Sequence, residues 1–373
     1  MSEADASPLF DLTPTDEQAL MRETVRKFAA SEMRAVSRTA DEAGAAPLNF
    51  YAKTAELGFT MVAIPESLGG IGAARSPIGN ALIAEDLAQG DMSLAIGALA
   101  PLAFVNAVLD HGSATQQKVW LPPFADAAFR SATTALMEPG PRFDPAKLKT
   151  TARKDGDGWL LSGEKCMVPL GGSAELVLVI ATLEGEGPAA FVVEKGARGM
   201  SAKPEAYMGL RPLELSRVRL DGVHLPRSAK LGDGEKRFDL QRFVDLSRIG
   251  VGALSVGVGQ AILEYVKDYC NERVAFGEPI THRQAVAFMI ANMAIELDGM
   301  RLMVWRAASR AEQGLDFHRE AYLARVQCAR HGMKIGTDGV QLLGGHGFIR
   351  EHMVELWYRN IRAAGILEGC VTV

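Results

Sequence analysis

One acid near the end of the chain, Glu368, is the residue best suited to act as a base. It follows the apolar pair Ile366-Leu367 and precedes Gly369. Glycine lets the backbone approach a ligand closely, and apolar neighbours would raise the proton affinity of the carboxylate. A glycine-dense bend at residues 341–348 (QLLGGHGF) and an aromatic-rich stretch at residues 354–360 precede it. We therefore predict that Glu368 removes a proton from a bound ligand.

Composition limits the kinds of protein that could carry this base. The chain has 373 residues, of which 48% are hydrophobic and 23% charged. This length and this composition allow two or three domains, each with its own hydrophobic core. A net charge of -5 argues against a nucleic-acid or anionic-membrane surface. No apolar run is expected to approach the roughly 20 residues of a membrane span, and no secretion signal is recognised. We therefore expect a cytoplasmic protein. Four scattered cysteines without C-x-x-C spacing suggest neither a zinc site nor disulfides.

Helix signals come first, strand signals occupy the middle, and helix signals return. Residues 13–17 predict a helix start, with a capping hydroxyl and Pro14 at the first helical position, and more helices extend to about residue 130. The turn at residues 155–158 predicts a hairpin. A long helical run begins near Phe238 and continues, with breaks at residues 277–279 and near Gly314, to about Leu342. Further strands are expected at residues 176–182, 189–194 and 216–220.

These elements predict a mostly α-helical protein with a β middle domain. We expect an N-terminal helical domain over residues 1–130, a small antiparallel β-barrel or sandwich over 131–234, and a C-terminal helical bundle over 235–373. Strands do not alternate with helices, which disfavours a doubly wound nucleotide-binding sheet. Two Gly-Val-Gly runs, at residues 250–252 and 257–259, lie inside an apparent helix. We interpret them as close-packing positions and not as a dinucleotide-binding loop.

The C-terminal motifs resemble those of a known family. The order Q-x-x-G-G-x-G-[FY], Y-R and E-G resembles the C-terminal signature of the acyl-CoA dehydrogenase family. Residues 272–284 (ERVAFGEPITHRQ) are similar to the family's E-R-x-x-F-G-x-P-[IL]-x-x-x-Q. The resemblance covers nearly the whole chain. It implies an FAD-dependent enzyme in which Glu368 takes the α proton of an acyl-CoA thioester while hydride leaves the β carbon for the flavin.

The same resemblance implies a set of FAD-binding residues. Arg273 would neutralise the pyrophosphate, Phe276 would pack on the cofactor, and Gln284 would reach the adenosine half. A planar guanidinium suits a diphosphate. The family makes these contacts across a subunit boundary, as it does through Gln341 and the pair Gly344-Gly345. We therefore expect a homodimer or a dimer of dimers, with an electron-transfer flavoprotein as electron acceptor.

Around the expected flavin ring, the chain departs from the family pattern. Met137 replaces a hydroxyl that bonds the ring, and Phe143 replaces a serine that touches the acyl-CoA. Met167 stands in place of a tryptophan, and Pro169 in place of a hydroxyl near flavin N5. Met167 can still supply apolar contact, but Pro169 offers no donor. We expect at least two flavin hydrogen bonds, each worth about 0.5–1.5 kcal/mol, to be missing.

Two further positions bear on the assignment of the base. Arg248 matches an arginine that the family keeps beside the active site, where a role at the substrate and a structural salt bridge both stay open. Some branches of the family carry their catalytic base on the same helix as Arg248. The matching position here is Ser247, which cannot act as the base, so Glu368 remains the candidate. After Gly369 the family usually adds a Thr-Ser-type flavin contact and a helix. Here the sequence reads Cys370-Val-Thr-Val373, so part of the cofactor cover is expected to be absent.

Two functions remain open at this point. The first is an FAD-dependent acyl-CoA dehydrogenase that forms a trans-2-enoyl thioester. The second is a non-catalytic subunit that lends Arg273, Gln284 and Gly344-Gly345 to the FAD of a partner. A flavin oxidase or monooxygenase on the same fold is a lesser alternative.

Overall fold

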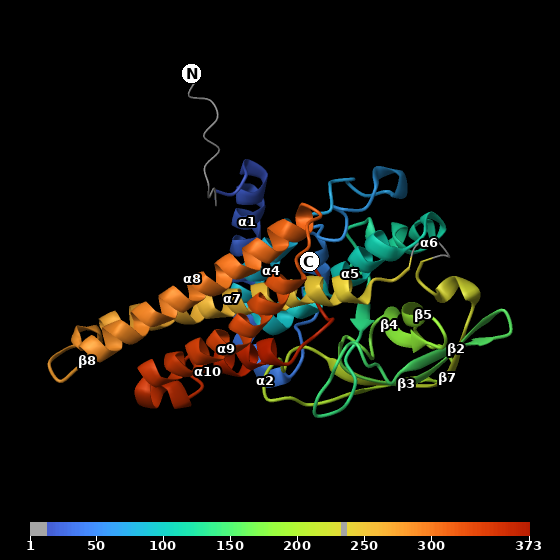
Figure 1. The fold of residues 1–373 in the computed structure, drawn as a ribbon. Helices are drawn as coiled ribbons and strands as arrows, with labels where there is room; N and C mark the ends of the chain where they lie inside the picture. Colours follow the sequence, from blue (N-terminus) through green and yellow to red (C-terminus); the bar gives the residue numbers. More distant parts are fainter. Residues whose placement is uncertain (1–12, 233–236) are drawn as a thin grey trace, which may run out of the picture.

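The computed structural model describes residues 13–232 and 237–373 (Figure 1). Helices come first in the chain, a sheet occupies the middle, and long helices complete it. The sheet lies at one end of the molecule, and the long helices extend away from it (Figure 1). The predicted fold class, with a β domain between two helical parts, is confirmed. The expected boundary at residue 234 falls outside the described residues.

The N-terminal helices begin one residue after a capping threonine. Thr15 accepts a hydrogen bond from the backbone of Gln18, and the Gln18 side chain caps Thr15 in return. Pro14 therefore precedes the cap and does not occupy the first helical position. The helices are α1 (Asp16–Phe28), a π-helical turn η1 (Ala29–Arg34), α2 (Ala35–Ala43), α3 (Phe50–Ala55), α4 (Pro77–Gly90), α5 (Met92–His111) and α6 (Ala114–Trp120).

The middle of the chain forms one mixed sheet. Its strands are β1 (Ala132–Ala135), β2 (Thr151–Asp155), β3 (Gly158–Pro169), β4 (Leu176–Leu183), β5 (Gly187–Glu194), β6 (Met200–Pro204) and β7 (Leu215–Leu225). The strand order is β1-β4-β2-β3-β7-β6, and β5 pairs with β4. The predicted β2–β3 hairpin is present. The expectation of an antiparallel domain is wrong for β4, because that strand runs parallel to both β1 and β2.

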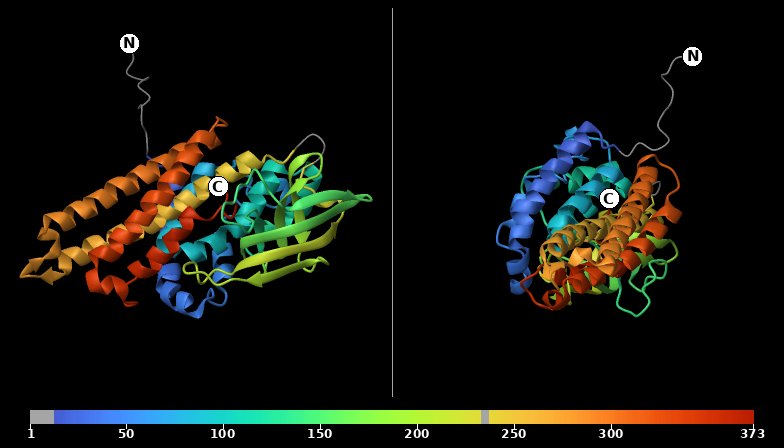
Figure 2. Two further views of the ribbon diagram at one scale, coloured as in Figure 1. Left: turned by 60° about the horizontal axis from the view of Figure 1, so that its bottom comes forward. Right: turned by 90° about the vertical axis from the view of Figure 1, so that its left-hand side faces the viewer.

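The C-terminal part is built on three long helices. They are α7 (Leu240–Glu272), α8 (Gln284–Glu312) and α9 (His318–Leu342), followed by the turn η6 (Gly344–Phe348) and by α10 (Val354–Ile361). The predicted break after α7 is a small hairpin of β8 (Val274–Ala275) and β9 (Glu278–Pro279). Viewed along the bundle, the N-terminal helices in blue and the C-terminal helices in orange and red lie on opposite sides (Figure 2).

The glycines of α7 serve close packing, as predicted. A Cβ added at Gly257 would lie 2.0 Å from the backbone oxygen of Glu85 in α4, and one at Gly252 would lie 2.9 Å from Val304 Cγ2 in α8. These contacts leave no room for a larger side chain. The two Gly-Val-Gly runs are therefore helix–helix contacts.

Replacing Gly257 with alanine is expected to destabilise the protein by about 1–3 kcal/mol, because the new methyl group forces α4 and α7 apart. Gly299 on α8 is the matched control, since a Cβ there meets no described residue within 4 Å. Gly299→Ala should be neutral or stabilising by about 0.5–1 kcal/mol. Urea unfolding of both variants provides the measurement. Equal stabilities would contradict the packing role of Gly257.

Two helices contradict the expectation that no apolar run approaches the length of a membrane span. By length and composition alone, α5 and α7 are apolar enough to cross a membrane, with mean hydropathies of 2.0 and 1.5. In the structure, 94% of the apolar window of α5 and 78% of that of α7 are buried inside the protein. Core helices pass the same test, and burial accounts for their apolarity here.

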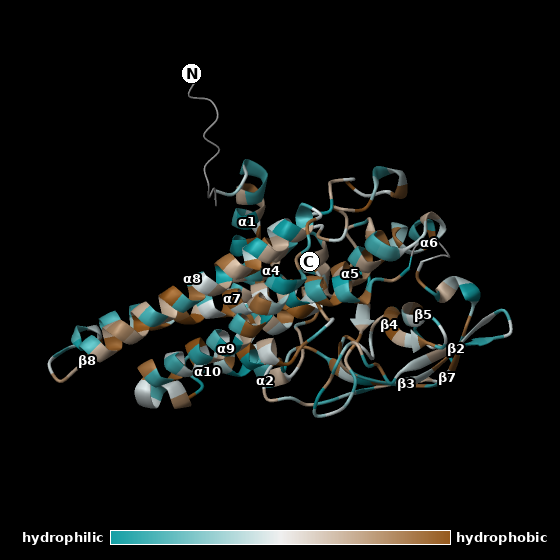
Figure 3. Cartoon of the chain, viewed as in Figure 1, coloured by the Kyte–Doolittle hydropathy of each residue, from teal (hydrophilic) through white to brown (hydrophobic). Residues whose placement is uncertain are grey.

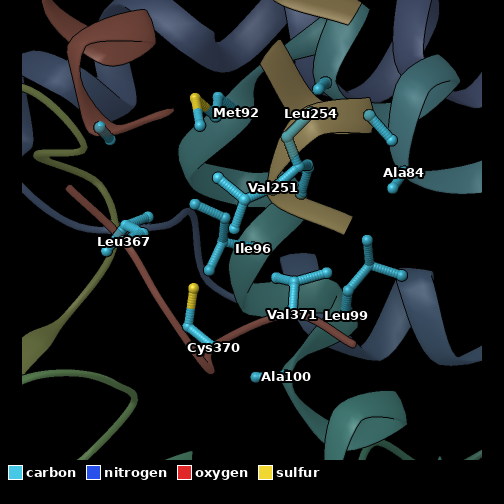
Figure 4. Packing of buried hydrophobic residues seen from close by; sticks show 14 of the residues in the cluster. Ala84, Met92, Ile96, Leu99, Ala100, Val251, Leu254, Leu367, Cys370 and Val371 are labelled. Atoms are coloured by element: carbon cyan, nitrogen blue, oxygen red, sulfur yellow. The ribbon is translucent and has the colours of Figure 1, made fainter. Parts of the chain in front are cut away.

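The segment after Glu368 enters the core beside α5 and α7. Cys370 and Val371 belong to the same buried cluster as Ile96, Leu99 and Val251 (Figure 4). On α5, Asn106 Nδ2 donates a hydrogen bond to the backbone oxygen of Thr372 at 3.0 Å. This anchorage fixes the backbone directly after the candidate base.

Candidate active site

The turn that carries Glu368 is tied to both the sheet and the long helices. The Gly369 N–H donates to Ser247 Oγ of α7 at 2.8 Å, and Thr134 Oγ1 of β1 donates to the Gly369 carbonyl. Gly369 has φ +74, and a Cβ there would lie 2.5 Å from Leu136 Cβ. Glycine is required at this position for both reasons. Ser247 therefore anchors the turn that holds the acid.

Two guanidinium groups face the Glu368 carboxylate. Arg248 Nε lies 3.3 Å from Oε1, and Arg325 Nε lies 3.6 Å from the same oxygen. The other oxygen, Oε2, is buried and has no hydrogen-bond partner among the described residues. Besides the apolar residues Ile366 and Leu367 that precede it in the chain, the acid thus has two arginine neighbours, one on α7 and one on α9. One oxygen is held, and the other is left to accept a proton.

Arg248 also belongs to a wider polar cluster. Its Nη1 pairs with Asp245 Oδ1 at 3.2 Å, and Asp245 Oδ2 contacts His318 Nδ1 at 2.9 Å. The guanidinium lies 5.8 Å from the ring centre of Tyr322. Arg248 thus forms a structural salt bridge and also contacts the candidate base.

Arg325 is a site residue that the sequence reasoning missed. It lies on α9, next to the buried positions Ala324 and Cys328, and its side chain is 11% exposed. Burial lowers the pKa of Arg325, and the nearby Glu368 opposes that shift. An arginine next to a face of small buried residues is the signal that could have revealed it.

Met137 lies directly against the backbone of the base. The Glu368 N–H donates to Met137 Sδ at 3.3 Å, and Met137 is buried. A thioether is only a weak acceptor, so a stronger acceptor can displace it at small cost. The position at which the sequence implied a lost flavin contact therefore contacts the base itself.

The loop that follows Met137 is fixed by a buried ion pair. Lys165 Nζ on β3 lies 2.8 Å from Glu138 Oε1 and 3.0 Å from the Leu136 carbonyl oxygen. The carboxylate also accepts backbone hydrogen bonds from Lys149 and Thr150, at 2.6 and 2.8 Å. Burial lowers the pKa of Lys165 to about 8, although the charge and the hydrogen bond of Glu138 act to raise it. Burial acts to raise the pKa of Glu138, but the Lys165 charge and these hydrogen bonds bring that pKa below its usual value.

The other predicted ring contacts lie in β3, and Phe143, the predicted substrate contact, lies in the loop after β1. Met167 is half-buried and has φ +52, within a register shift between β3 and β7. Pro169 ends β3 opposite Leu215 and is buried. Phe143 is partly buried against the apolar cluster of the sheet and the neighbouring helices. Met137 and Pro169 are thus positioned on the sheet side of the site.

The remaining predicted cofactor residues gather at the opposite end of α7. Arg273 and Gln284 are exposed, and Phe276 is 94% exposed at the β8–β9 turn. Gln341 and the pair Gly344-Gly345 are also exposed, and a Cβ at either glycine would meet no part of the described chain within 4 Å. The hydrogen bond of Tyr269 on α7 to His346, at 2.8 Å, places this turn beside the end of α7.

A long distance separates the two groups within one chain. Arg248 and Glu272 are 24 positions apart on α7, which at 1.5 Å per residue is about 36 Å. No side chain spans that distance. The structure therefore brings together Glu368, Arg248 and Met137, but it leaves Arg273 and its neighbours on a separate exposed surface.

Helices, a sheet and long helices follow one another along the chain, and the acid is held by α7 and α9 beside β1. Three domain models match the chain in order: the acyl-CoA dehydrogenase N-terminal domain at residues 15–128, the middle domain at 133–223 and the C-terminal domain at 239–373. The chain therefore belongs to the acyl-CoA dehydrogenase family, a family of FAD-dependent oxidoreductases.

Individual relatives agree with this assignment. The chain is 30% identical over 357 residues to the mitochondrial short-chain specific acyl-CoA dehydrogenase of Bos taurus, covering 94% of this chain and 86% of the relative. Butyryl-CoA dehydrogenase from Megasphaera elsdenii superposes with a TM-score of 0.88 at 26% identity, covering 97% and 96% of the two chains. A chain from the structure of the electron transferring flavoprotein of Acidaminococcus fermentans matches with a TM-score of 0.88 at 27% identity, covering 97% and 96%.

Proposed function

We propose that the protein oxidises an acyl-CoA thioester to the trans-2-enoyl-CoA, with Glu368 as the base and FAD as the hydride acceptor. The observation that carries this proposal is the state of the Glu368 carboxylate. One oxygen is held by Arg248 and Arg325, and the other is buried without a partner in the described part of the chain. A general base needs a positioned lone pair that is free to take a proton.

The residues around the acid support the individual roles. Glu368 Oε2 takes the proton from the α carbon, and the electron pair of that C–H bond stays on the substrate. The thioester oxygen, which gains charge, replaces Met137 Sδ as the acceptor of the Glu368 N–H. Arg248 keeps the acid in place through Oε1. When bound, FAD accepts the hydride from the β carbon and later passes electrons to an electron-transfer flavoprotein.

The residues present fit FAD in two different ways. On the sheet side, Met137 and Met167 offer polarizable apolar contact, whereas Pro169 offers no donor. At the far end of α7, Arg273 offers a guanidinium for the pyrophosphate, and Phe276 offers an exposed ring. The open backbone at Gly344-Gly345, together with Gln284 and Gln341, suits close approach of the dinucleotide.

The separation of about 36 Å along α7 supports a site shared by two chains. In a two-fold dimer, the far end of α7 in one chain can reach the sheet side of the other. The outer face of α8 supports such pairing, because Phe288, Ile295 and Leu302 recur every seven residues and are 58%, 68% and 46% exposed. Apolar brown segments recur along this helix in Figure 3. The proposed homodimer, or dimer of dimers, would cover this face. A cytoplasmic location stays a prediction.

A mixed-subunit experiment tests both the base and the shared site. Arg273→Gln should lose flavin, and Glu368→Gln should keep flavin but lose turnover. In a dimer of one chain of each kind, one of the two sites regains both Glu368 and Arg273. Refolding the two inactive variants together should therefore restore activity. Absence of any recovery, with mixed dimers demonstrated by differential tags, would contradict a site shared by two chains. Lys267→Gln, an exposed change on the last part of α7, is the control and should retain flavin.

A non-catalytic partner subunit is the second candidate, and two observations favour it. The Glu368 N–H is already taken by Met137 Sδ, and Pro169 offers the sheet side no donor where the family pattern has a hydroxyl. The visible spectrum distinguishes the two functions. About one flavin per chain and bleaching by an acyl thioester support the dehydrogenase. A folded oligomer that binds no added FAD would favour the partner subunit.

A further inference from the structure

We propose that Arg325 is a positioning residue for Glu368, which together with Arg248 fixes Oε1 so that Oε2 is presented to the substrate. This inference rests on the proposed function, because it assigns a role to a residue that acts through the base. It adds a second arginine, from α9, to the one on α7. Neither the sequence motifs nor the α7 contacts indicate this role for Arg325.

The first argument is geometric. Arg248 Nε and Arg325 Nε approach the same oxygen of Glu368, at 3.3 and 3.6 Å, from two different helices. Side-chain exposures of 13% for Glu368, 14% for Arg248 and 11% for Arg325 place the three groups away from bulk water. A carboxylate held through one oxygen from two directions cannot rotate freely about its last bond. The orientation of Oε2 is therefore set by both arginines.

The second argument is the difference between the two arginines. Arg248 divides its interactions between Glu368 and Asp245, and Asp245 also contacts His318. Among residues 13–232 and 237–373, Arg325 forms its ion pair with Glu368 alone, and its Nη1 is buried without an acceptor. The charge of Arg325 therefore acts mainly on the base.

The third argument concerns charge during the reaction. When the α C–H bond breaks, its proton moves to Glu368 Oε2 and its electron pair stays on the substrate. Glu368 becomes neutral, so Arg325 loses its counter-charge at that moment, whereas Arg248 keeps Asp245. Before the transfer, both guanidinium groups stabilise the ionised acid, so their charges by themselves oppose its protonation. Arg325 therefore helps the reaction by fixing the orientation of Oε2 and not by its charge.

The pH dependence is set by a short list of charged groups. Arg248 on α7 and Arg325 on α9 pair with the acid; Arg248 also pairs with Asp245 and lies over the Tyr322 ring, and His318 is reached through Asp245. Cys328 and Cys370 interact electrostatically with Arg325, and burial raises the pKa of each thiol to about 12. Both cysteines therefore stay neutral across the working range. Loss of the Arg325 charge should shift the titration of the base to higher pH.

The test compares three variants in the flavin-loaded oligomer. Arg325→Gln removes the charge, Arg325→Lys keeps it with altered geometry, and Arg330→Gln changes an exposed arginine on the same helix. For Arg325→Gln, kcat should fall on the order of 10²-fold with a smaller change in KM, and the acid limb of the pH profile should move to higher pH. Arg325→Lys should restore the pH profile but only part of the rate. Arg330→Gln should match the unmodified protein.

A second readout does not depend on turnover. The infrared carboxyl band that disappears in Glu368→Gln reports the protonation of the acid, and its titration midpoint should lie at higher pH in Arg325→Gln. Unchanged midpoints and an unchanged pH profile in Arg325→Gln would overturn the positioning role, as would equal effects in Arg330→Gln. A shifted midpoint in a protein that bleaches with no thioester would support the role of Arg325 and refute the proposed dehydrogenation.

Discussion

Replacing Glu368 with glutamine should lower the rate of flavin reduction by an acyl thioester about 10²–10⁴-fold, the usual contribution of a positioned general base. Glutamine has nearly the same shape, and the turn is held independently by Ser247 and Thr134. The variant should therefore keep its fold and its flavin. The amide cannot take the α proton, so bleaching by the thioester should disappear while the oxidised flavin spectrum remains.

Glu320 provides a matched control for this change. It lies on α9, its side chain is 13% exposed like that of Glu368, and it also pairs with two arginines, Arg306 and Arg310, at 3.7 Å each. Glu320→Gln removes the same charge from a similar setting without touching the site. Stopped-flow reduction under anaerobic conditions should separate the two variants. Equal rates in Glu368→Gln and in the unmodified protein would remove Glu368 from the mechanism.

The second large effect is expected at the buried ion pair of Lys165 and Glu138. Lys165→Met should cost about 3–5 kcal/mol of stability, because Glu138 stays buried without its cation. Lys165 is 0% exposed and Glu138 is 6% exposed. The double variant, which combines Lys165→Met with Glu138→Gln, should recover part of the loss because it leaves no charge at either position. Urea unfolding followed by circular dichroism measures the unmodified protein and both variants. A double variant no more stable than Lys165→Met would contradict the charge argument.

Alkaline pH gives an independent check on the same pair. Burial lowers the pKa of Lys165 to about 8 from an ordinary value of 10.5, so between these values the unfolded chain binds more protons than the folded one. Between pH 8 and 10.5, the free energy of unfolding of the unmodified protein therefore rises with pH relative to that of Lys165→Met. The exposed pair of Lys53 and Glu32 supplies the control, since Lys53→Met should leave stability nearly unchanged. A stability difference that falls from pH 8 to 10.5 would contradict the assignment.

The position of Glu368 could be predicted from the sequence, but its surroundings could not. The acid lies in a turn whose glycine is required locally, and local signals of this kind are visible in a sequence. The two arginines reach it from helices that are distant along the chain, and only packing brings them together. Arg248 was found through its motif, whereas Arg325 belongs to none of the recognised motifs. The apolar residues before Glu368 therefore describe only part of its environment.

The sheet shows the same division between local and distant signals. The hairpin of β2 and β3 could be predicted, because its glycine-containing turn joins two strands that are adjacent in the sequence. The parallel pairing of β4 with β1 and β2 depends on how distant segments meet, and no local residue encodes it. Lys165 follows the buried positions Trp159 and Leu161 at even spacing along β3, so its inward orientation was visible in the strand pattern. The identity of its partner, Glu138, was not.

The buried pair of Lys165 and Glu138 also constrains how this sequence can evolve. A substitution at either position alone passes through a protein with an uncompensated buried charge, at a cost that is a large part of the roughly 5–15 kcal/mol by which domains are stable. Most lineages would lose such an intermediate before a second change could follow. The two residues should therefore be inherited together or exchanged together, and among relatives their identities should covary more strongly than those of exposed pairs such as Lys53 and Glu32.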